Sequence, residues 1–349
     1  MKFPSKFFLL LMIFCNVIFV KAQSGGASFS FVDMGQTARV ASLGGEAITA
    51  SDDDIGNVLF NPSLLRTSMH NSISFSFVNY FSGINYGTVS YAANIKKLGT
   101  FAFHAQYANY GNIIVTDFMG GEHGTATAND IALVAGWGKN IIDSQFTIGA
   151  NAKFMFSQIH NYYGMALGVD VSATYTLPNK NFAASLLLRN IGGSIKPYSN
   201  GNFGWMPFEL SIAIYGKIPH APFRVFFEIT NLQKWKLNYD NPYASADIET
   251  GEVIKSSKTK MFFDNLARHL VLGLEVIPYK NIYLRAAYNY NRGADLINSD
   301  KPGMVGFSWG VGFRVYKFDL SYARSSFYRL GSPNYITLSM NLNSFNKKR

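Results

Sequence analysis

Apolar and polar or small residues alternate with a period of two over unusually long stretches of this sequence. From Tyr163 to Tyr175 every second residue is apolar, and the residues between them are Gly, Ala, Asp, Ser or Thr. Successive side chains of an extended strand point to opposite faces, so the pattern predicts strands with one apolar face. Strands in globular sheets usually have about 5–6 residues, whereas about ten suit a tilted strand that crosses a bilayer.

Two further observations favour a membrane barrel over a large soluble β-sandwich, which is the alternative for such a pattern. Only 15% of the residues are charged, and no segment after the first 22 residues offers eighteen consecutive apolar residues for a membrane-spanning helix. Aromatic residues near the strand ends, typical of interfacial girdles, include Tyr80, Tyr91, Tyr110, Tyr163, Tyr175 and Tyr290.

The number of strands and the lengths of their connections agree with a barrel. Fourteen segments start near residues 71, 84, 99, 128, 145, 162, 181, 208, 223, 269, 282, 305, 318 and 334. All even-numbered connections are short, and four odd-numbered ones are long, namely 111–127, 191–207, 231–268 and 292–304. Outer-membrane barrels alternate short periplasmic turns with long outer loops. We therefore expect an all-β fold over 71–345, a roughly 14-stranded antiparallel transmembrane outer-membrane β-barrel with both mature termini in the periplasm.

The first 22 residues read as a secretory signal peptide. Lys2 and Lys6 precede the apolar stretch 7–20, and Val20-Lys21-Ala22 provides small residues for cleavage. Export through this signal implies a location in the cell outer membrane. The single cysteine, Cys15, lies in this segment, so we expect neither disulfides nor cysteine metal ligands in the mature chain.

Residues 23–70 do not alternate and predict an ordered hatch, or plug, inside the barrel; a flexible periplasmic extension is the alternative. The segment 38–50 is small, glycine-containing and weakly helical, and the acidic residues 52–54 are suited to cap a short helix that runs to about Phe60. Asn61-Pro62 would end that helix.

The same segment resembles the N-terminal hatch of the PorV/PorQ family of type IX secretion proteins, which are themselves similar to fatty-acid-transporter (FadL-like) barrels. The residues that carry the resemblance are Phe29, Phe31, Ala38, Arg39, Ala41, Leu43, Gly44, Gly45, Asp52, Asp53, Asp54, Asn61, Pro62, Ser63, Leu64 and Leu65. Of these, Arg39, Gly44, Gly45, Asp52, Asp54, Asn61 and Pro62 are the expected structural residues of the hatch.

Further motifs resemble the PorQ members more than the PorV members of this family. They are 189–192, 231–235, Arg268-His269 with Gly273 and Glu275, Tyr288-Asn289 and 306–314. The resemblance implies a scaffold of type IX secretion that docks a PorZ-like surface protein, with possible PorU/PorV-like components, in a complex that attaches secreted cargo to the cell surface.

Motifs that suggest catalysis lack their structural context. Ser308 stands in a Gly-x-Ser-x-Gly pattern that needs a strand-to-helix turn, yet the alternation continues through it and predicts a small residue facing the lumen. Ser257 and Lys260 form an isolated Ser-x-x-Lys. No histidine pair has metal-ligand spacing, and Ser63 stands where a calcium loop needs Glu. We expect no enzyme activity, metal or cofactor.

The formal net charge is +10, but the lysines and arginines are dispersed, and every short turn carries a lysine. A nucleic-acid binder gathers such charge on one face, so we expect no nucleic acid as a partner. Cations at barrel rims fit outer-membrane lipid and lipopolysaccharide phosphates, or an acidic partner.

Loops on a rigid barrel are where binding residues are expected, and aromatic and apolar loop residues are suitable anchors. The candidates are Trp205, Met206, Asn231, Trp235, Phe262 and Phe263. The main functional hypothesis is therefore the secretion scaffold, and the alternative is a FadL-like transporter of hydrophobic molecules. That alternative needs an apolar pocket between hatch and wall and a kinked strand. An open porin is disfavoured because the hatch would block the lumen, and a secreted enzyme is the remotest possibility.

Overall fold

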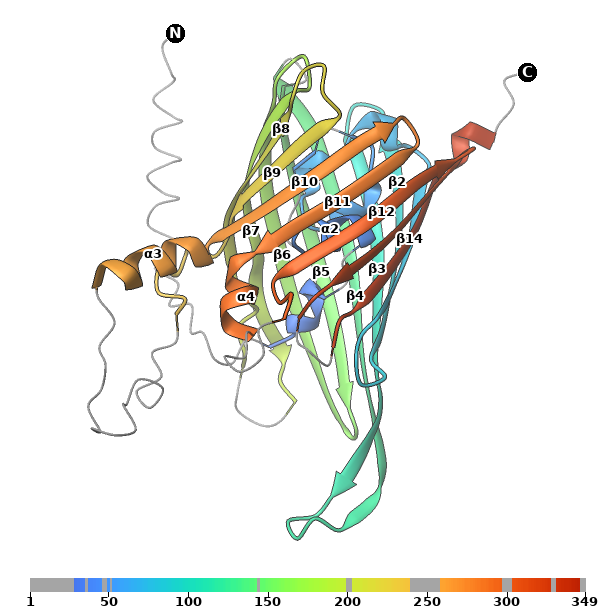
Figure 1. The fold of residues 1–349 in the computed structure, drawn as a ribbon. Coiled ribbons are helices and arrows are strands. Elements are labelled where there is room, and N and C mark those ends of the chain that lie inside the picture. The colour runs from blue at the N-terminus through green and yellow to red at the C-terminus, as the bar shows by residue number, and fades with distance from the viewer. Residues whose placement is uncertain are drawn as a thin grey trace, which may run out of the picture.

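The computed structural model forms a closed barrel of fourteen antiparallel strands, with short helices inside it and at both ends, one of them η5 (Leu342–Phe345) after the last strand (Figure 1). Each strand pairs with its neighbours in sequence, and β1 (Ser72–Asn79) pairs with β14 (Asn334–Asn341) to close the wall. The structure describes residues 28–34, 37–45, 49–50, 52–142, 145–198, 203–238, 258–296, 303–327 and 331–345. The expected signal peptide, 1–22, lies outside these residues.

The wall consists of twelve further strands between β1 and β14. They are β2 (Asn85–Ile95), β3 (Gly99–Thr116), β4 (Glu122–Ile142), β5 (Phe146–Ile159), β6 (Tyr162–Thr176), β7 (Phe182–Lys196), β8 (Glu209–Lys217), β9 (Phe223–Ile229), β10 (Leu270–Tyr279), β11 (Ile282–Asn289), β12 (Phe307–Val315) and β13 (Phe318–Ser325). The fourteen-stranded barrel expected from the alternation is thus confirmed, and every strand except β4 starts within two residues of its expected position.

The exception is β4, where the sequence predicted a long loop over 111–127. Instead β3 and β4 continue as a hairpin that extends far beyond the rest of the wall (Figure 1). Asn112 pairs with Thr127 and Thr116 with Glu122, past an irregularity after Asn109. Backbone pairing between the two strands maintains the ladder through this segment. Similarly, β7 runs to Lys196, past the expected loop start at Ile191.

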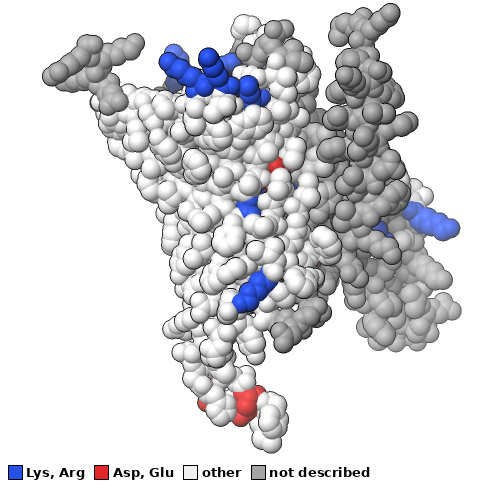
Figure 2. Space-filling view, turned by 180° about the vertical axis from the view of Figure 1, so that it is seen from behind, with Lys and Arg blue, Asp and Glu red and all other residues white. Residues whose placement is uncertain are grey.

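The alternation sorts side chains between the two faces of the wall. In β1, Ser74 and Ser76 are buried, whereas Phe75 and Phe77 are 41% and 49% exposed on the outer face. Seen from behind, the wall is largely free of charge between Lys and Arg at one end and Asp and Glu at the tip of the β3–β4 hairpin (Figure 2). This outer surface, with few charged side chains, matches apolar surroundings such as lipid.

The two ends of the barrel differ. The even-numbered connections form a short-turn end, for example Lys280-Asn281 between β10 and β11. The odd-numbered connections form a long-loop end, which carries the β3–β4 hairpin, α3 (Lys258–Arg268) and α4 (Tyr290–Leu296) (Figure 1). None of the helices among the described residues has the length and apolar character needed to span a membrane.

The described residues before β1, from 28 onward, lie inside the barrel and pack against the inner wall (Figure 1). Its short elements are η1 (Ser30–Asp33), α2 (Ala38–Ser42), η2 (Ile55–Leu59), η3 (Pro62–Leu64) and η4 (Thr67–Met69). Thr37 caps α2 by accepting a hydrogen bond from the Val40 N–H, and Asp54 caps η2 through the Gly56 N–H. The expected partly helical hatch is therefore present. Pro62 follows the end of η2, as expected, and is also the first residue of η3.

Candidate functional site

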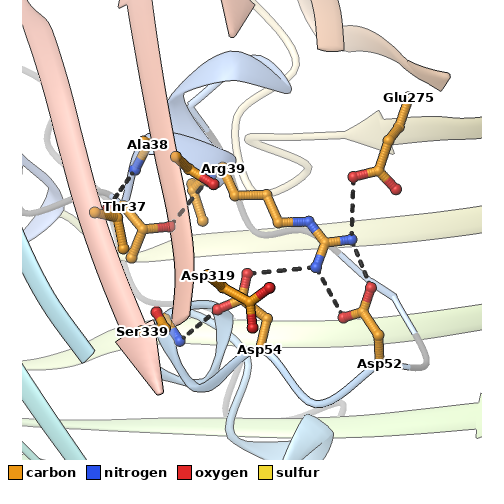
Figure 3. A network of polar contacts seen from close by, with 12 residues as sticks. Thr37, Ala38, Arg39, Asp52, Asp54, Glu275, Asp319 and Ser339 are labelled. Atoms are coloured by element: carbon orange, nitrogen blue, oxygen red, sulfur yellow. Dashed lines mark hydrogen bonds and ion pairs between the residues drawn. The ribbon is translucent and has the colours of Figure 1, made fainter. Parts of the chain in front are cut away.

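Arg39 of the hatch is the centre of an ion-pair network near the short-turn end (Figure 3). Its guanidinium lies 2.6 Å from the carboxylate of Asp52, 3.3 Å from Asp54 and 3.5 Å from Glu275. Asp52 and Asp54 belong to the same hatch, whereas Glu275 belongs to β10 of the wall. Arg39 therefore ties the hatch together and also fastens it to the barrel.

Glu275 is fully buried and is the wall carboxylate that contacts Arg39. We call the whole network the hatch anchor; its members are Arg39, Asp52, Asp54, Arg224, Glu275 and Arg285. Arg224 of β9 lies 2.9 Å from Glu275 and 3.4 Å from Asp52. Arg285 of β11 donates to Glu275 at 2.8 Å. A buried carboxylate is tolerated only when it is paired and hydrogen-bonded, and three neighbouring elements provide this.

The two hatch carboxylates respond differently to the same surroundings. Burial acts to raise the pKa of Asp52, but Arg39, together with Arg224 and Arg285, lowers the pKa to about 2. For Asp54, burial outweighs the attraction of Arg39 and raises the pKa above its ordinary value. Asp52 is thus the carboxylate that gains most from the pair with Arg39.

A polar pocket of about 350 Å³ opens beside the hatch anchor at the short-turn end. Its lining combines Arg39, Arg224, Arg285 and Arg314 with Asp52, Asp53, Asp54 and Asp319. Arg314 and Asp319 form an exposed pair at 2.6 Å. Positive and negative side chains balance in this pocket, so it does not favour an anion over a cation.

A second buried polar cluster lies in the wall at an irregularity between β6 and β7. The Lys153 ammonium lies 2.8 Å from Asp170 and donates to the amide oxygen of Asn190 at 2.7 Å. The pairing of β6 with β7 shifts between Val169 and Val171, and Asn190 has φ of 57°. Asp170 accepts the Asn190 N–H at 2.8 Å in place of a regular ladder bond. The wall therefore has a bulge, held by charges that face inward.

An apolar groove of about 920 Å³ lies over this part of the wall. Its lining includes exposed apolar side chains of β3, β4, β5, β6 and β7, which are Phe103, Leu133, Phe154, Leu167, Val169 and Ile191. Gly168, beside the bulge, also lines the groove. From inside the barrel, Met206 approaches so closely that a Cβ on Gly168 would lie 2.5 Å from the Met206 sulfur.

The structure places the expected hatch residues Asn61, Pro62 and Gly44 against the inner wall. The Asn61 side chain donates to Ser185 of β7 at 3.1 Å, and Pro62 begins η3 against β5. Gly44 has φ of 112° and faces Val271 of β10. Gly45 also has a positive φ, of 85°.

The loop candidates fall into two groups. Trp205, Trp235, Phe262 and Phe263 are exposed, and Trp235 stacks on His269 at 5.5 Å and contacts Phe262 at 5.4 Å. Met206, by contrast, is buried and packs inside the barrel, where a docking partner does not reach it. Asn231 has φ of 56° and holds a turn after β9.

Of the motifs that suggest catalysis, the Gly-x-Ser-x-Gly pattern has its serine within a strand. Ser308 is buried within β12, where it accepts a hydrogen bond from Arg292 at 2.6 Å, and no strand-to-helix turn follows it. Among the residues that the structure describes, no three His, Cys, Asp or Glu side chains are grouped to hold a metal ion. Ser257 lies outside the described residues.

The sequence did not single out the wall's contributions to the two clusters. Arg224, Arg285, Lys153 and Asp170 were not candidates, and Glu275 entered only as part of a motif. The available signal was an ionisable residue on the inward face of an otherwise alternating strand.

No family model and no curated protein matches this sequence. Among solved structures, the fold is similar to that of a TodX deltaS2S3 mutant, a monoaromatic hydrocarbon channel, at 12% identity over 88% of this chain and 99% of that chain, with a TM-score of 0.50. The toluene transporter TodX of Pseudomonas putida is 12% identical over 87% of this chain and 96% of its own, with a TM-score of 0.49. A FadL homologue of Pseudomonas aeruginosa is 10% identical over 91% and 99% of the two chains, with a TM-score of 0.45. At such low identity the first match shows the fold alone, an outer-membrane β-barrel.

Proposed function

We propose that this protein is a FadL-like outer-membrane channel for small hydrophobic molecules, with its long-loop end outside the cell. In this proposal residues 1–22 are removed on export, 23–70 are the hatch and both mature termini face the periplasm. The fold is shared with a hydrocarbon channel, and the hatch occupies the barrel, which disfavours an open diffusion porin.

The contact between Met206 and Gly168 supports this function best. Met206 belongs to an apolar cluster between the hatch and the inner wall that also contains Phe29, Phe31 and Tyr86. Gly168 separates this cluster from the apolar groove on the outer face. Apolar surfaces therefore meet the wall from both sides at Gly168, beside the β6–β7 bulge, and a hydrophobic molecule passes sideways into the bilayer there.

Uptake measurements test the proposal. In a Gram-negative host without its own fatty-acid transporter, expression should raise the initial uptake of labelled toluene or long-chain fatty acid several-fold above that of the empty vector. Uptake of a labelled hydrophilic oligosaccharide serves as the control and should not change. Vector-level uptake of both hydrophobic probes, with the barrel folded by heat-modifiable gel migration, would contradict the proposal.

The second candidate is the scaffold of type IX secretion, which the sequence resemblance favours. The protruding β3–β4 hairpin adds a specific observation, because Phe118 and Met119 at its tip are 94% and 82% exposed. Exposed Trp205 on the β7–β8 connection is a further anchor for a surface partner. Deletion of the gene should then leave secreted cargo unattached, and a tagged protein should retain a surface partner in detergent. Normal display of cargo in the deletion strain would exclude this function.

A further inference from the structure

Helix α3 runs sideways from the long-loop end, across the direction of the strands and away from the barrel (Figure 1). It directly precedes β10, so its position relative to the wall is fixed at its C-terminal end. A helix held outside the barrel buries little of its surface against the protein. The residues on its two sides indicate what surrounds it.

One side of α3 is polar and contacts the loops of the barrel. Arg268 pairs with Asp264 at 2.9 Å, one helical turn earlier, and with Asp295 of α4. The hydroxyl of Tyr290, the first residue of α4, donates to Asp264 at 3.1 Å. This side of the helix is therefore held against α4.

The opposite side of α3 is apolar and exposed. Phe262, Phe263 and Leu266 are 49%, 61% and 39% exposed, and they share one face at helical spacing. Trp235, which is 51% exposed, extends this face through its contact with Phe262. We call these four residues the α3 patch. A patch of this kind on a protein surface marks a contact with another apolar phase or molecule.

The α3 patch is continuous in sequence with the lipid-facing wall. Leu272 and Leu274 of β10, which follow α3 directly, are 51% and 39% exposed on the outer face. Lys258 and Lys260, at the far end of the helix, are exposed and carry positive charge. Amphipathic helices with this combination lie in the membrane interface, with aromatic residues in the headgroup and acyl boundary and lysines at the phosphates.

We propose that α3 lies in the plane of the membrane, with the α3 patch inserted into the lipid leaflet at the long-loop end. Lipid is favoured over a protein partner because the patch adjoins a surface that already faces lipid. The helix then increases the area that the protein covers in that leaflet, and it keeps the β9–β10 connection in contact with the leaflet. This inference rests on the barrel fold and does not depend on what the channel carries.

Tryptophan quenching by brominated lipid acyl chains tests this position. Three single-tryptophan proteins are compared in nanodiscs with and without brominated lipid: one keeps Trp235, one keeps Trp309 of the outer wall, and one carries Phe118→Trp at the hairpin tip; the other tryptophans are Phe. Quenching of Trp235 and Trp309 by about half or more, with Phe118→Trp unaffected, is the expected result. Replacement of Phe262 and Phe263 by Ser should weaken the quenching of Trp235 alone.

Two results would overturn the proposal. Trp235 quenched no more than Phe118→Trp, in a barrel in which Trp309 is quenched, would place the α3 patch outside the lipid. Quenching that is unchanged by the double Ser substitution would show that the aromatic residues do not insert the helix. The first result would favour a protein partner as the occupant of the patch.

Discussion

The guanidinium of Arg39 lies 3.5 Å from a carboxylate oxygen of Glu275, and this contact joins the hatch to the barrel wall (Figure 3). The two residues are 236 positions apart in the chain, and both side chains are buried. Because Glu275 also pairs with Arg224 and Arg285, loss of Arg39 leaves the wall's own pairs in place. Substitutions at Arg39 therefore act mainly on the hatch.

Replacement of Arg39 by Met should loosen the hatch without opening the wall. The change leaves Asp52 and Asp54 without their main partner, and breaking a buried pair in this way typically costs about 3–5 kcal/mol. Hydrogen exchange followed by mass spectrometry should show lost protection over 38–60 and unchanged protection in β10. Arg314→Met is the matched control, because the exposed pair with Asp319 is worth at most about 1 kcal/mol. Equal protection of 38–60 in the wild type and Arg39→Met would contradict the anchoring role.

The contribution of Asp52 to stability should depend on pH at the acid end. Its folded pKa of about 2 lies below the ordinary value of 3.8, so the pair stabilises the fold above about pH 4 and is lost as the pH falls toward 2. The shift corresponds to at most about 2 kcal/mol. Asp54, whose pKa is raised, works in the opposite direction and reduces the net effect.

Urea unfolding in detergent micelles, in the wild type and in Asp52→Asn, isolates this contribution. The variant should be less stable by at most about 2 kcal/mol at pH 7. The difference should shrink as the pH falls toward 2, where about half of the folded wild-type carboxyl is protonated. A difference that stays constant from pH 7 to pH 2 would assign the loss to packing rather than to charge.

The strands could be predicted from sequence because the alternation of apolar and polar residues within each strand distinguishes its outer face from its inner face. The alternation of Ser74 and Ser76 with Phe75 and Phe77 already states which side meets lipid. The protruding hairpin could not be predicted in this way, since Asn112 and Thr127 are held by pairing with each other and their side chains carry no regular pattern.

The clusters of the candidate site were less accessible from sequence. Arg39, Asp52 and Asp54 were recognised within the hatch, but their partner Glu275 is fixed only when the barrel closes and brings β10 to the hatch. The same holds for Lys153 and Asp170, which lie on adjacent strands whose register decides whether they meet. Long-range register is the information that a local pattern lacks.

Gly149 of β5 should be needed for the hatch to approach the wall. A Cβ at this position would lie 2.3 Å from the Pro62 carbonyl carbon and 2.4 Å from the Ser63 nitrogen, both backbone atoms that cannot turn aside. Gly149→Ala should therefore cost about 1–3 kcal/mol through overpacking. Thermal unfolding of the purified barrel measures the loss. Gly216→Ala is the control, because nothing lies within 4 Å of that Cβ. Equal melting temperatures for the two variants would show that the hatch backbone at Pro62 and Ser63 moves away from the added Cβ without a loss of stability.

A disulfide across the β6–β7 bulge should block transport if hydrophobic molecules leave through this part of the wall. Val169 and Ile191 are paired across the two strands and both line the groove, and directly opposite residues have Cα separations that a disulfide can bridge. Val169→Cys with Ile191→Cys should reduce uptake of labelled toluene to the level of the vector, and a reductant should restore it.

The matched control for this crosslink is Ile148→Cys with Ala173→Cys, a pair that joins β5 to β6 away from the bulge. Because regular ladder bonds already hold those strands together, the control disulfide should leave uptake unchanged. If both crosslinks abolish uptake, the whole wall must deform and the bulge has no special role. If neither does, hydrophobic molecules take a path that does not separate β6 from β7.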